Sequence, residues 1–217
     1  KKRLAERVNL YPRVVDEAYF SNNRESFQEL DFIFTTWGML PLQHEDLDCL
    51  PRLKAVFHAA GATSAFRGPF LERGITVCSA SEANSIPVAE FALAQILLAG
   101  AGYFRNTREC RNPFMTDQRN AFRGHGNYKN RVAILGNGTI SRKLQAFLGL
   151  HDLEVAVIPS RKENRTLSLE DAFASAFALV NLFPDRDDNT GIFDAALFQR
   201  MIEGAVFINL GRGRQVN

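Results

Sequence analysis

Short apolar runs rich in Val, Ile and Phe alternate along the chain with segments whose apolar residues recur at helical spacing. Runs of the first kind predict buried strands and occupy residues 31–38, 54–61, 75–80, 131–136, 154–159, 177–184 and 205–211. Helical patterns lie between them, over residues 43–53, 69–73, 140–149, 168–176 and 193–202. This alternation is typical of an α/β protein, in which helices cover a parallel sheet.

A polar, arginine-rich segment interrupts this alternation at residues 105–130. Before it lies the longest helical pattern, which starts after Asn84, with Asn84 or Ser85 as N-cap and Pro87 near the first turn. We therefore predict two domains, residues 1–102 and 103–217, with residues 105–130 as an arm or linker. Few aromatic residues stand among the arginines, so a solvated excursion is a simpler interpretation of this segment than nucleic-acid binding.

The composition fits a globular protein of one or two domains, with 217 residues, 46% of them hydrophobic and 23% charged. The net charge is +2 and the basic residues are dispersed, which predicts neither a nucleic-acid nor a membrane surface. Cys49, Cys78 and Cys110 form no CxxC pair and have no histidine nearby, so we expect reduced thiols, no metal site and a cytoplasmic protein. The most apolar segment, residues 87–104, contains a glutamate and a glutamine, which favours a buried helix over a membrane span.

The segment from residue 131 to residue 159 predicts a strand–turn–helix–strand unit with a glycine fingerprint in its turn. Gly136 and Gly138 fill the first two positions of a GxGxxG pattern, where glycines allow a sharp turn and close approach of a pyrophosphate to a helix N-terminus. Ser141 takes the third position, and its side chain is small enough to leave the anion site intact. We therefore predict a dinucleotide-binding turn here.

The residues after the second strand of this unit bear on the choice of dinucleotide. An NAD-binding protein usually has an acidic residue there, which binds the ribose hydroxyls. Here Pro159 is followed by Ser160, Arg161 and Lys162, two cations and a hydroxyl that suit a 2′-phosphate. The pattern favours NADP over NAD; the alternative is a surface loop that is basic by chance.

Ligands of doubly wound sheets gather at the carboxyl ends of the strands, which is where Pro184 and the run from Asn209 to Arg212 fall. Arg212 stands between two glycines directly after an apolar strand. We expect its side chain to face the cofactor crevice.

Five segments, in this order, resemble the D-isomer-specific 2-hydroxyacid dehydrogenases, a family that includes phosphoglycerate, formate and D-lactate dehydrogenases and glyoxylate and hydroxypyruvate reductases. These segments are LKAVFHAAGAT, ERGITVCSASEANSIPVAEFALAQILLA, RVAILGNGTIS, LVNLFPDRDDNTG and MIEGAVFINLGRG. The resemblance runs from about Asp31 to Asn217. It implies a flavodoxin-like substrate domain followed by a Rossmann-type, doubly wound dinucleotide-binding domain.

The resemblance also implies roles for single residues. Arg212 matches the family's catalytic arginine, whose guanidinium can bind the carboxylate and carbonyl oxygens of a 2-oxo acid. The other matches comprise the substrate-carboxylate loop Ala60, Gly61 and Ala62; the pyrophosphate turn Gly136, Gly138, Thr139 and Ile140; Val88 near the nicotinamide; and Pro184 and Asn209 beside the cofactor.

Each of these residues also has a structural interpretation. Gly61 could be a turn glycine, Val88 a core residue of the long helix, Asn209 a strand-end residue and Arg212 an exposed arginine in a glycine loop. The functional interpretation of Arg212 is favoured because strand, motif and crevice agree.

The sequence departs from the family pattern at the proton donor, a histidine braced by a glutamate, both located after the arginine motif. Residues 1–217 contain neither at that position, and the resemblance implies a chain truncated at both ends relative to the family. Of the histidines present, only His58 stands near the predicted crevice, and we interpret it as a strand-end residue because no carboxylate lies at a recognisable spacing.

Two functions follow from the sequence. The first is an enzyme that reduces a small 2-oxo acid of the glyoxylate or hydroxypyruvate type with NAD(P)H, working as the homodimer that the resemblance implies. The second is a non-catalytic dinucleotide-binding module of the same family, similar to its transcriptional corepressors. Pro159, Ser141 and the absent proton donor favour the second function, whereas Arg212 together with the substrate loop favours the first.

Overall fold

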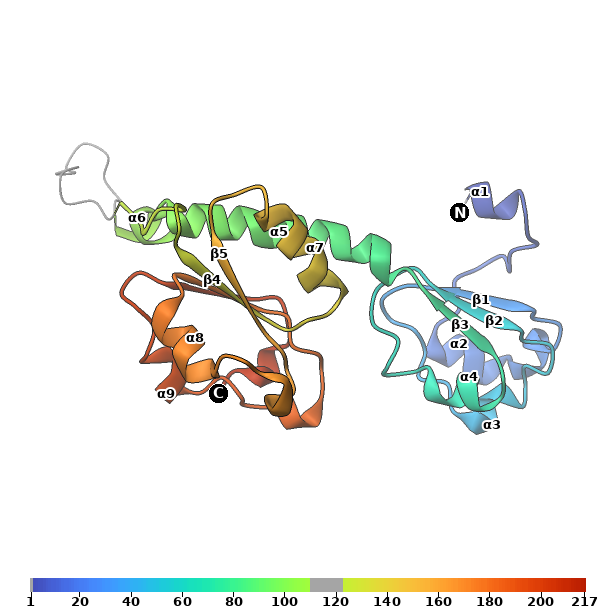
Figure 1. Ribbon diagram of the computed structural model, residues 1–217. Helices are drawn as coiled ribbons and strands as arrows, with labels where there is room; N and C mark the ends of the chain where they lie inside the picture. Colours follow the sequence, from blue (N-terminus) through green and yellow to red (C-terminus); the bar gives the residue numbers. More distant parts are fainter. Residues whose placement is uncertain (1, 110–122) are drawn as a thin grey trace. The chain divides into compact units, whose positions relative to one another are not determined.

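The computed structural model describes residues 2–109 and 123–217, which fold into two compact units, Lys1–Ser81 and Glu82–Asn217 (Figure 1). Cys110 and the middle of the predicted arm lie outside the described residues.

The first unit is built on a three-stranded parallel sheet in the order β1-β2-β3. The strands are β1 (Phe32–Thr35), β2 (Ala55–His58) and β3 (Thr76–Ser79). Its helices are α1 (Lys2–Ala5), α2 (Glu17–Asn22), the 3-10 turn η1 (Arg24–Phe27), α3 (His44–Leu47) and α4 (Gly68–Glu72).

The register of this sheet separates a covered face from an open one. Ile33, Val56 and Val77 are paired across the strands and pack into a core with the apolar residues of α2, α3 and α4. On the other face Phe34 stacks on Phe57 with ring centroids 5.2 Å apart, and both side chains are partly exposed. Gly74 ends the α4 segment with φ of +72°, a conformation that suits glycine, and leads the chain into β3.

The second unit is a four-stranded parallel sheet in the order β5-β4-β6-β7. Its strands are β4 (Arg131–Leu135), β5 (Glu154–Ile158), β6 (Ala178–Asn181) and β7 (Val206–Asn209). Its helices are α5 (Ser81–Gly100), α6 (Tyr103–Glu109), α7 (Thr139–Leu148), α8 (Leu169–Ser175) and α9 (Ala195–Phe198), with 3-10 turns η3 (Lys162–Asn164), η4 (Asp187–Asn189) and η5 (Gly213–Gln215).

Both faces of this second sheet are covered, as Figure 1 shows. Ile134 and Val180 pack on one side with α5 and α7, whereas Leu135 and Leu179 pack on the other with α8 and α9. The chain runs from β4 to β5 on one side and then crosses to β6 on the other side of β4. The carboxyl ends of β4 and β6 therefore form the switch point at which doubly wound sheets bind ligands.

The α/β class and the doubly wound second sheet confirm the fold predicted from the sequence, and every described strand falls inside a predicted run. The helix predicted over residues 43–53 is shorter, because α3 ends at Leu47 ahead of Pro51, which lacks the N–H a helix needs. The helix predicted over residues 193–202 is also shorter, and α9 ends at Phe198.

The long helix α5 differs from the prediction in its first residue and in the unit against which it packs. α5 begins at Ser81 rather than after Asn84, so Pro87 lies inside the helix instead of near its first turn. By length and composition α5 could span a membrane, with a mean hydropathy of 1.3. Its residues Ala89, Ala92 and Ile96 are buried in the core of the second unit, which explains why the compact units divide at Ser81 rather than at the predicted residue 102.

Candidate functional site

The glycine turn between β4 and α7 has the geometry that the fingerprint predicts. Gly136 has φ of +128°, and its N–H donates a hydrogen bond to the carbonyl of Ile158 at the end of β5 (2.8 Å). A Cβ at Gly136 would lie 2.7 Å from the carbonyl oxygen of Leu182, just after β6. Glycine at this position therefore lets the turn pack between the ends of β5 and β6.

The second glycine of the turn is open to its surroundings. Gly138 is the N-cap of α7 and supplies no side-chain cap. A Cβ built on it would meet nothing within 4 Å. The first N–H groups of α7, from Thr139 and Ile140 onward, are thus available to an anion at the N-terminus of the helix.

Ser141 occupies the position of the third glycine in the GxGxxG pattern, and its side chain fits there without strain. It is fully buried, and its hydroxyl accepts a hydrogen bond from Gln145 Nε2 at 3.1 Å. The buried polar group is therefore satisfied, as burial requires.

The residues after β5 form a basic turn held by an arginine that the sequence did not reveal. Arg165 donates to the carbonyls of Pro159 (Nε, 2.9 Å) and Ser160 (Nη2, 2.8 Å), and its guanidinium lies over the ring of Phe183. Burial lowers the pKa of Arg165, against the opposing effect of nearby acidic groups. Arg161 remains exposed, with the carboxylate of Glu163 at 3.9 Å.

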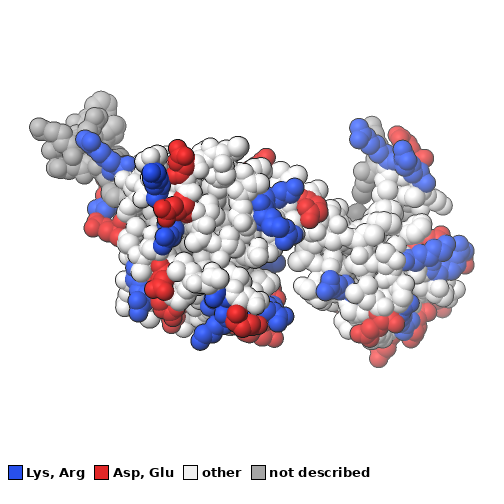
Figure 2. All heavy atoms as spheres, viewed as in Figure 1, with Lys and Arg blue, Asp and Glu red and all other residues white. Residues whose placement is uncertain are grey.

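A groove of about 860 Å³ runs between this turn and the segment after β6. Its basic residues are Arg161, Lys162, Arg165 and Arg186, and its acidic residues are Glu163, Glu170 and Asp188. Arg186 is neutralised by Asp188, with Nε and Nη2 at 2.8 and 2.6 Å from the carboxylate oxygens. On the face of the molecule shown in Figure 2, acidic and basic side chains are mixed rather than gathered by sign.

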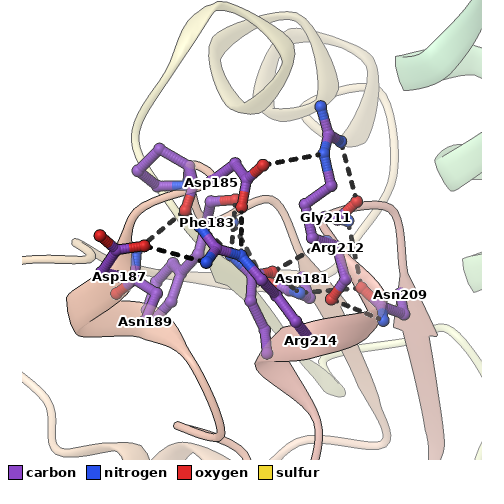
Figure 3. Close-up of polar contacts among 11 residues, drawn as sticks. Asn181, Phe183, Asp185, Asp187, Asn189, Asn209, Gly211, Arg212 and Arg214 are labelled. Carbon is purple, nitrogen blue, oxygen red and sulfur yellow. Dashed lines mark hydrogen bonds and ion pairs between the residues drawn. The ribbon is translucent and has the colours of Figure 1, made fainter. Parts of the chain in front are cut away.

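A buried amide network fixes the segment after β7, as Figure 3 shows. Gln215 is fully buried, and its Oε1 accepts hydrogen bonds from the backbone N–H of Arg212 (2.9 Å) and from Asn181 Nδ2 (2.8 Å). Gln215 Nε2 donates to the carbonyls of Phe183 (3.2 Å) and Pro184 (2.9 Å). The ends of β6 and β7 are thereby tied together.

Two further contacts complete this network. Asn181 Nδ2 also donates to Asn209 Oδ1 (2.8 Å), which in turn accepts the N–H of Gly211 (3.1 Å). A Cβ at Gly211 would collide with the amides of Asn181 and Gln215. The backbone next to Arg212 is therefore closely packed on one side, and position 211 requires glycine.

The side chain of Arg212 is half-exposed and lies beside an acidic group. Its Nε is 3.6 Å from Asp185 Oδ2, and its Nη1 donates to the carbonyl of Gly211 (3.1 Å). Arg214 binds the same aspartate through Nε (2.7 Å) and reaches Asp187 through Nη1 (2.9 Å). Both carboxylates raise the pKa of Arg214.

The predicted substrate loop lies in the first unit, directly after β2. Ser79 Oγ bridges the carbonyls of Ala60 (3.1 Å) and Gly61 (2.5 Å), so these carbonyls are turned toward β3. Within residues 2–109 and 123–217, the N–H groups of Ala60, Gly61 and Ala62 donate no hydrogen bond; Ala60 is buried, whereas Gly61 and Ala62 are open to an acceptor. The loop thus has donors suited to a carboxylate.

His58 is the last residue of β2 and is 6% exposed. Its ring lies edge-on to Phe66, and its buried Nδ1 has no hydrogen-bond partner in the described part of the chain. Its position at the end of β2 is the one predicted from the sequence.

In the second unit the structure therefore brings the predicted residues Gly136, Gly138, Pro184, Asn209 and Arg212 to the carboxyl ends of the strands. Val88 lies partly buried in α5. Asp185, Arg165 and Gln215 are additions that the sequence did not reveal. Among the described residues no group of three His, Cys, Asp or Glu side chains could hold a metal ion, and Cys49 and Cys78 are free thiols.

Comparison with known proteins identifies one matching family and many solved structures with a similar fold. The model of the D-isomer specific 2-hydroxyacid dehydrogenase NAD-binding domain matches residues 93–217. No curated protein sequence matches the chain.

Three solved structures illustrate the similarity of fold. A formate dehydrogenase from Granulicella M. is 17% identical with a TM-score of 0.67, over 89% of this chain and 55% of its own. A D-lactate dehydrogenase from Aquifex aeolicus, in complex with NAD and lactic acid, is 17% identical with a TM-score of 0.65, over 89% and 60%. The acyclic imino acid reductase Bsp5, in complex with NADPH and D-Arg, is 15% identical with a TM-score of 0.75, over 100% and 71%. The present chain thus spans little more than half the length of the two dehydrogenases.

Proposed function

Because the chain belongs to the D-isomer specific 2-hydroxyacid dehydrogenase family, we propose that the protein reduces a small 2-oxo acid to the D-2-hydroxy acid with NAD(P)H. The observation that carries this proposal is the position of Arg212. Its backbone N–H is held by Gln215 just after β7, at the same edge of the sheet as the carboxyl end of β4 and its open glycine turn. A guanidinium held there can meet a substrate beside a dinucleotide.

The residues of the second unit fit a dinucleotide. The free N–H groups at the start of α7 would hold the pyrophosphate, and the open space at Gly138 would admit it. Val88, Pro184 and Asn209 would border the cofactor. When bound, the nicotinamide would supply the hydride, and a separate donor would have to supply the proton that the resulting alkoxide takes up.

We propose NADP as the preferred dinucleotide. Pro159 replaces the acidic residue that would repel a 2′-phosphate, and the groove beside it contains Ser160, Arg161 and Arg165. Arg165 is committed to two backbone carbonyls, which leaves the exposed cations Arg161 and Lys162, and we assign the phosphate to Arg161.

Arg212 would bind the carboxylate and polarise the carbonyl oxygen, which gains negative charge as hydride arrives. The N–H groups of Ala60, Gly61 and Ala62 are further candidate donors to the substrate carboxylate. The resemblance to the glyoxylate and hydroxypyruvate reductases of the family is the basis on which we propose glyoxylate or hydroxypyruvate as the substrate.

None of the four histidines is assigned as proton donor. His58 is buried against Phe66, His125 Nε2 contacts the carbonyl of Glu203 at 2.8 Å, and His151 is exposed on the turn after α7. His44 pairs with Glu72 at 3.1 Å, between two helices at the surface of the first unit.

The test is reduction by the purified full-length protein, with NADPH or NADH and each of glyoxylate, hydroxypyruvate and pyruvate. We expect consumption of NADPH faster than NADH, with glyoxylate or hydroxypyruvate as the better substrate. Binding of the dinucleotide without consumption of it with any 2-oxo acid would favour the second candidate, a non-catalytic binding module. The specific observation behind that candidate is the carboxylate of Asp185, which lies 3.6 Å from Arg212 Nε and would compete with an anionic substrate.

We also propose that the protein is a homodimer formed through its second domain. The predicted arm, residues 105–130, would reach across to the partner. Light scattering of the full-length protein measures the mass, and a monomer at micromolar concentration would contradict this proposal.

A further inference from the structure

Two aspartates and two arginines form a charge-balanced cluster after β6 and β7 (Figure 3). Asp185 and Asp187 come from the segment after β6, and Arg212 and Arg214 from the segment after β7. The sequence separation of 27 to 29 residues between bonded partners means that the fold, rather than local chain geometry, creates the cluster.

The two arginines hold Asp185 unequally. Arg214 Nε lies 2.7 Å from Oδ1, a strong charge-assisted hydrogen bond. Arg212 Nε lies 3.6 Å from Oδ2, which is longer than a hydrogen bond and leaves mainly charge attraction. Arg212 is therefore oriented by Asp185 but not bound tightly to it.

We propose that Asp185 is a positioning residue for Arg212 and that Arg214 sets how strongly Asp185 holds it. This inference rests on the proposed function, in which Arg212 binds the 2-oxo acid. The carboxylate of Asp185 restricts the guanidinium to the carboxyl ends of β6 and β7, which aids the chemical step. The same carboxylate competes with the anionic substrate, and Arg214 weakens that competition by binding one oxygen of Asp185.

Because these two effects oppose each other, Asp185→Asn in the full-length protein should lower KM and kcat together. Loss of the competing charge should lower KM about two- to fivefold, the range expected for an exposed ion pair. Loss of orientation should lower kcat by about threefold or more. Asp185→Glu, which keeps the charge, should restore most of kcat. A KM that is unchanged or raised in Asp185→Asn would overturn the inference.

Arg214→Gln provides the second test. It frees Asp185 to bind Arg212 more closely, so KM should rise about two- to fivefold. In the double variant Asp185→Asn with Arg214→Gln this increase should disappear, because the carboxylate that competes for Arg212 is absent. An increase that persists in the double variant would mean that Arg214 acts directly on the substrate and would overturn its proposed role.

A matched control is Asp31→Asn in the first unit. Asp31 is also an aspartate with two basic partners, Lys54 at 2.8 Å and Arg52 at 3.4 Å, but it precedes β1, at the sheet end opposite to the substrate loop. The kcat and KM of the Asp31→Asn variant should match those of the wild-type protein.

Oxamate, an unreactive analogue of a 2-oxo acid, separates this inference from the proposed reaction. Its affinity for the protein–NADPH complex, followed by nicotinamide fluorescence, should rise about two- to fivefold in Asp185→Asn. A wild-type protein that reduces no 2-oxo acid contradicts the proposed function, whereas unchanged oxamate affinity in Asp185→Asn contradicts this inference alone.

Discussion

Alanine substitutions at the two glycines of the dinucleotide turn should have opposite consequences. At Gly136 the new Cβ would lie 2.7 Å from the carbonyl oxygen and 2.9 Å from the carbonyl carbon of Leu182, with φ at +128°. The strained backbone and the forced displacement of Leu182 each cost about 1–3 kcal/mol, about 4 kcal/mol together. That corresponds to a fall in Tm of about 8–16 °C for a chain of this size.

At Gly138 the same methyl group meets no protein atom within 4 Å, and the backbone φ of −94° suits alanine. Stability should therefore stay within about 1 kcal/mol of the wild-type value. The methyl group would, however, obstruct access to the N–H groups at the start of α7, so affinity for NADPH should fall at least about tenfold.

Thermal unfolding followed by circular dichroism and NADPH titration followed by fluorescence measure the two effects in the full-length protein. Gly149→Ala, at the other end of α7, is the control, because its Cβ would make only ordinary contacts at 3.5 Å. Wild-type NADPH affinity in Gly138→Ala would refute the assignment of this turn to the pyrophosphate. Wild-type stability in Gly136→Ala would refute the tight packing against Leu182.

Three further substitutions test the basic turn, the amide network and the first unit. Arg161→Ala should weaken NADPH binding about tenfold and leave NADH binding nearly unchanged, because only NADPH carries the 2′-phosphate; equal losses in paired titrations would remove this role. Gln215→Leu should cost about 2–3 kcal/mol in a denaturant titration, because it leaves the Arg212 N–H unpaired, and an unchanged midpoint would mean that water replaces the amide. The hydrogen bond from Lys54 lowers the pKa of Asp31, so its stabilisation is present above the unfolded pKa of about 3.9 and is lost as pH falls through the lower folded value. The stability difference between wild type and Asp31→Asn should therefore vanish below that window, and a difference constant with pH would contradict the assignment.

The strands and the glycine turn could be predicted from the sequence because their signals are local. Runs such as 131–136 and 177–184 are apolar at nearly every position, as strands buried on both faces must be. The boundary between the units was harder to locate, because the alanines of α5 indicate burial without indicating which sheet they contact.

The polar framework of the site could not be predicted for a different reason. Gln215 bonds to Asn181, 34 residues away, and Arg214 bonds to Asp185, 29 residues away. These pairs exist only because β6 and β7 are neighbours in the sheet, and nothing in the spacing of the residues indicates the partner. Arg165 is a similar case, since an arginine in a polar loop is most often solvated.

The proposed function depends above all on binding of the 2-oxo acid by Arg212 during reduction, which a single substitution can test. Arg212→Lys keeps the charge but loses the planar fork, so kcat/KM for glyoxylate or hydroxypyruvate should fall by about 100-fold or more while NADPH affinity stays near the wild-type value. Arg200→Lys, an exposed arginine after α9, is the matched control and should be unaffected. A kcat/KM in Arg212→Lys equal to that of the wild type would contradict this role of Arg212.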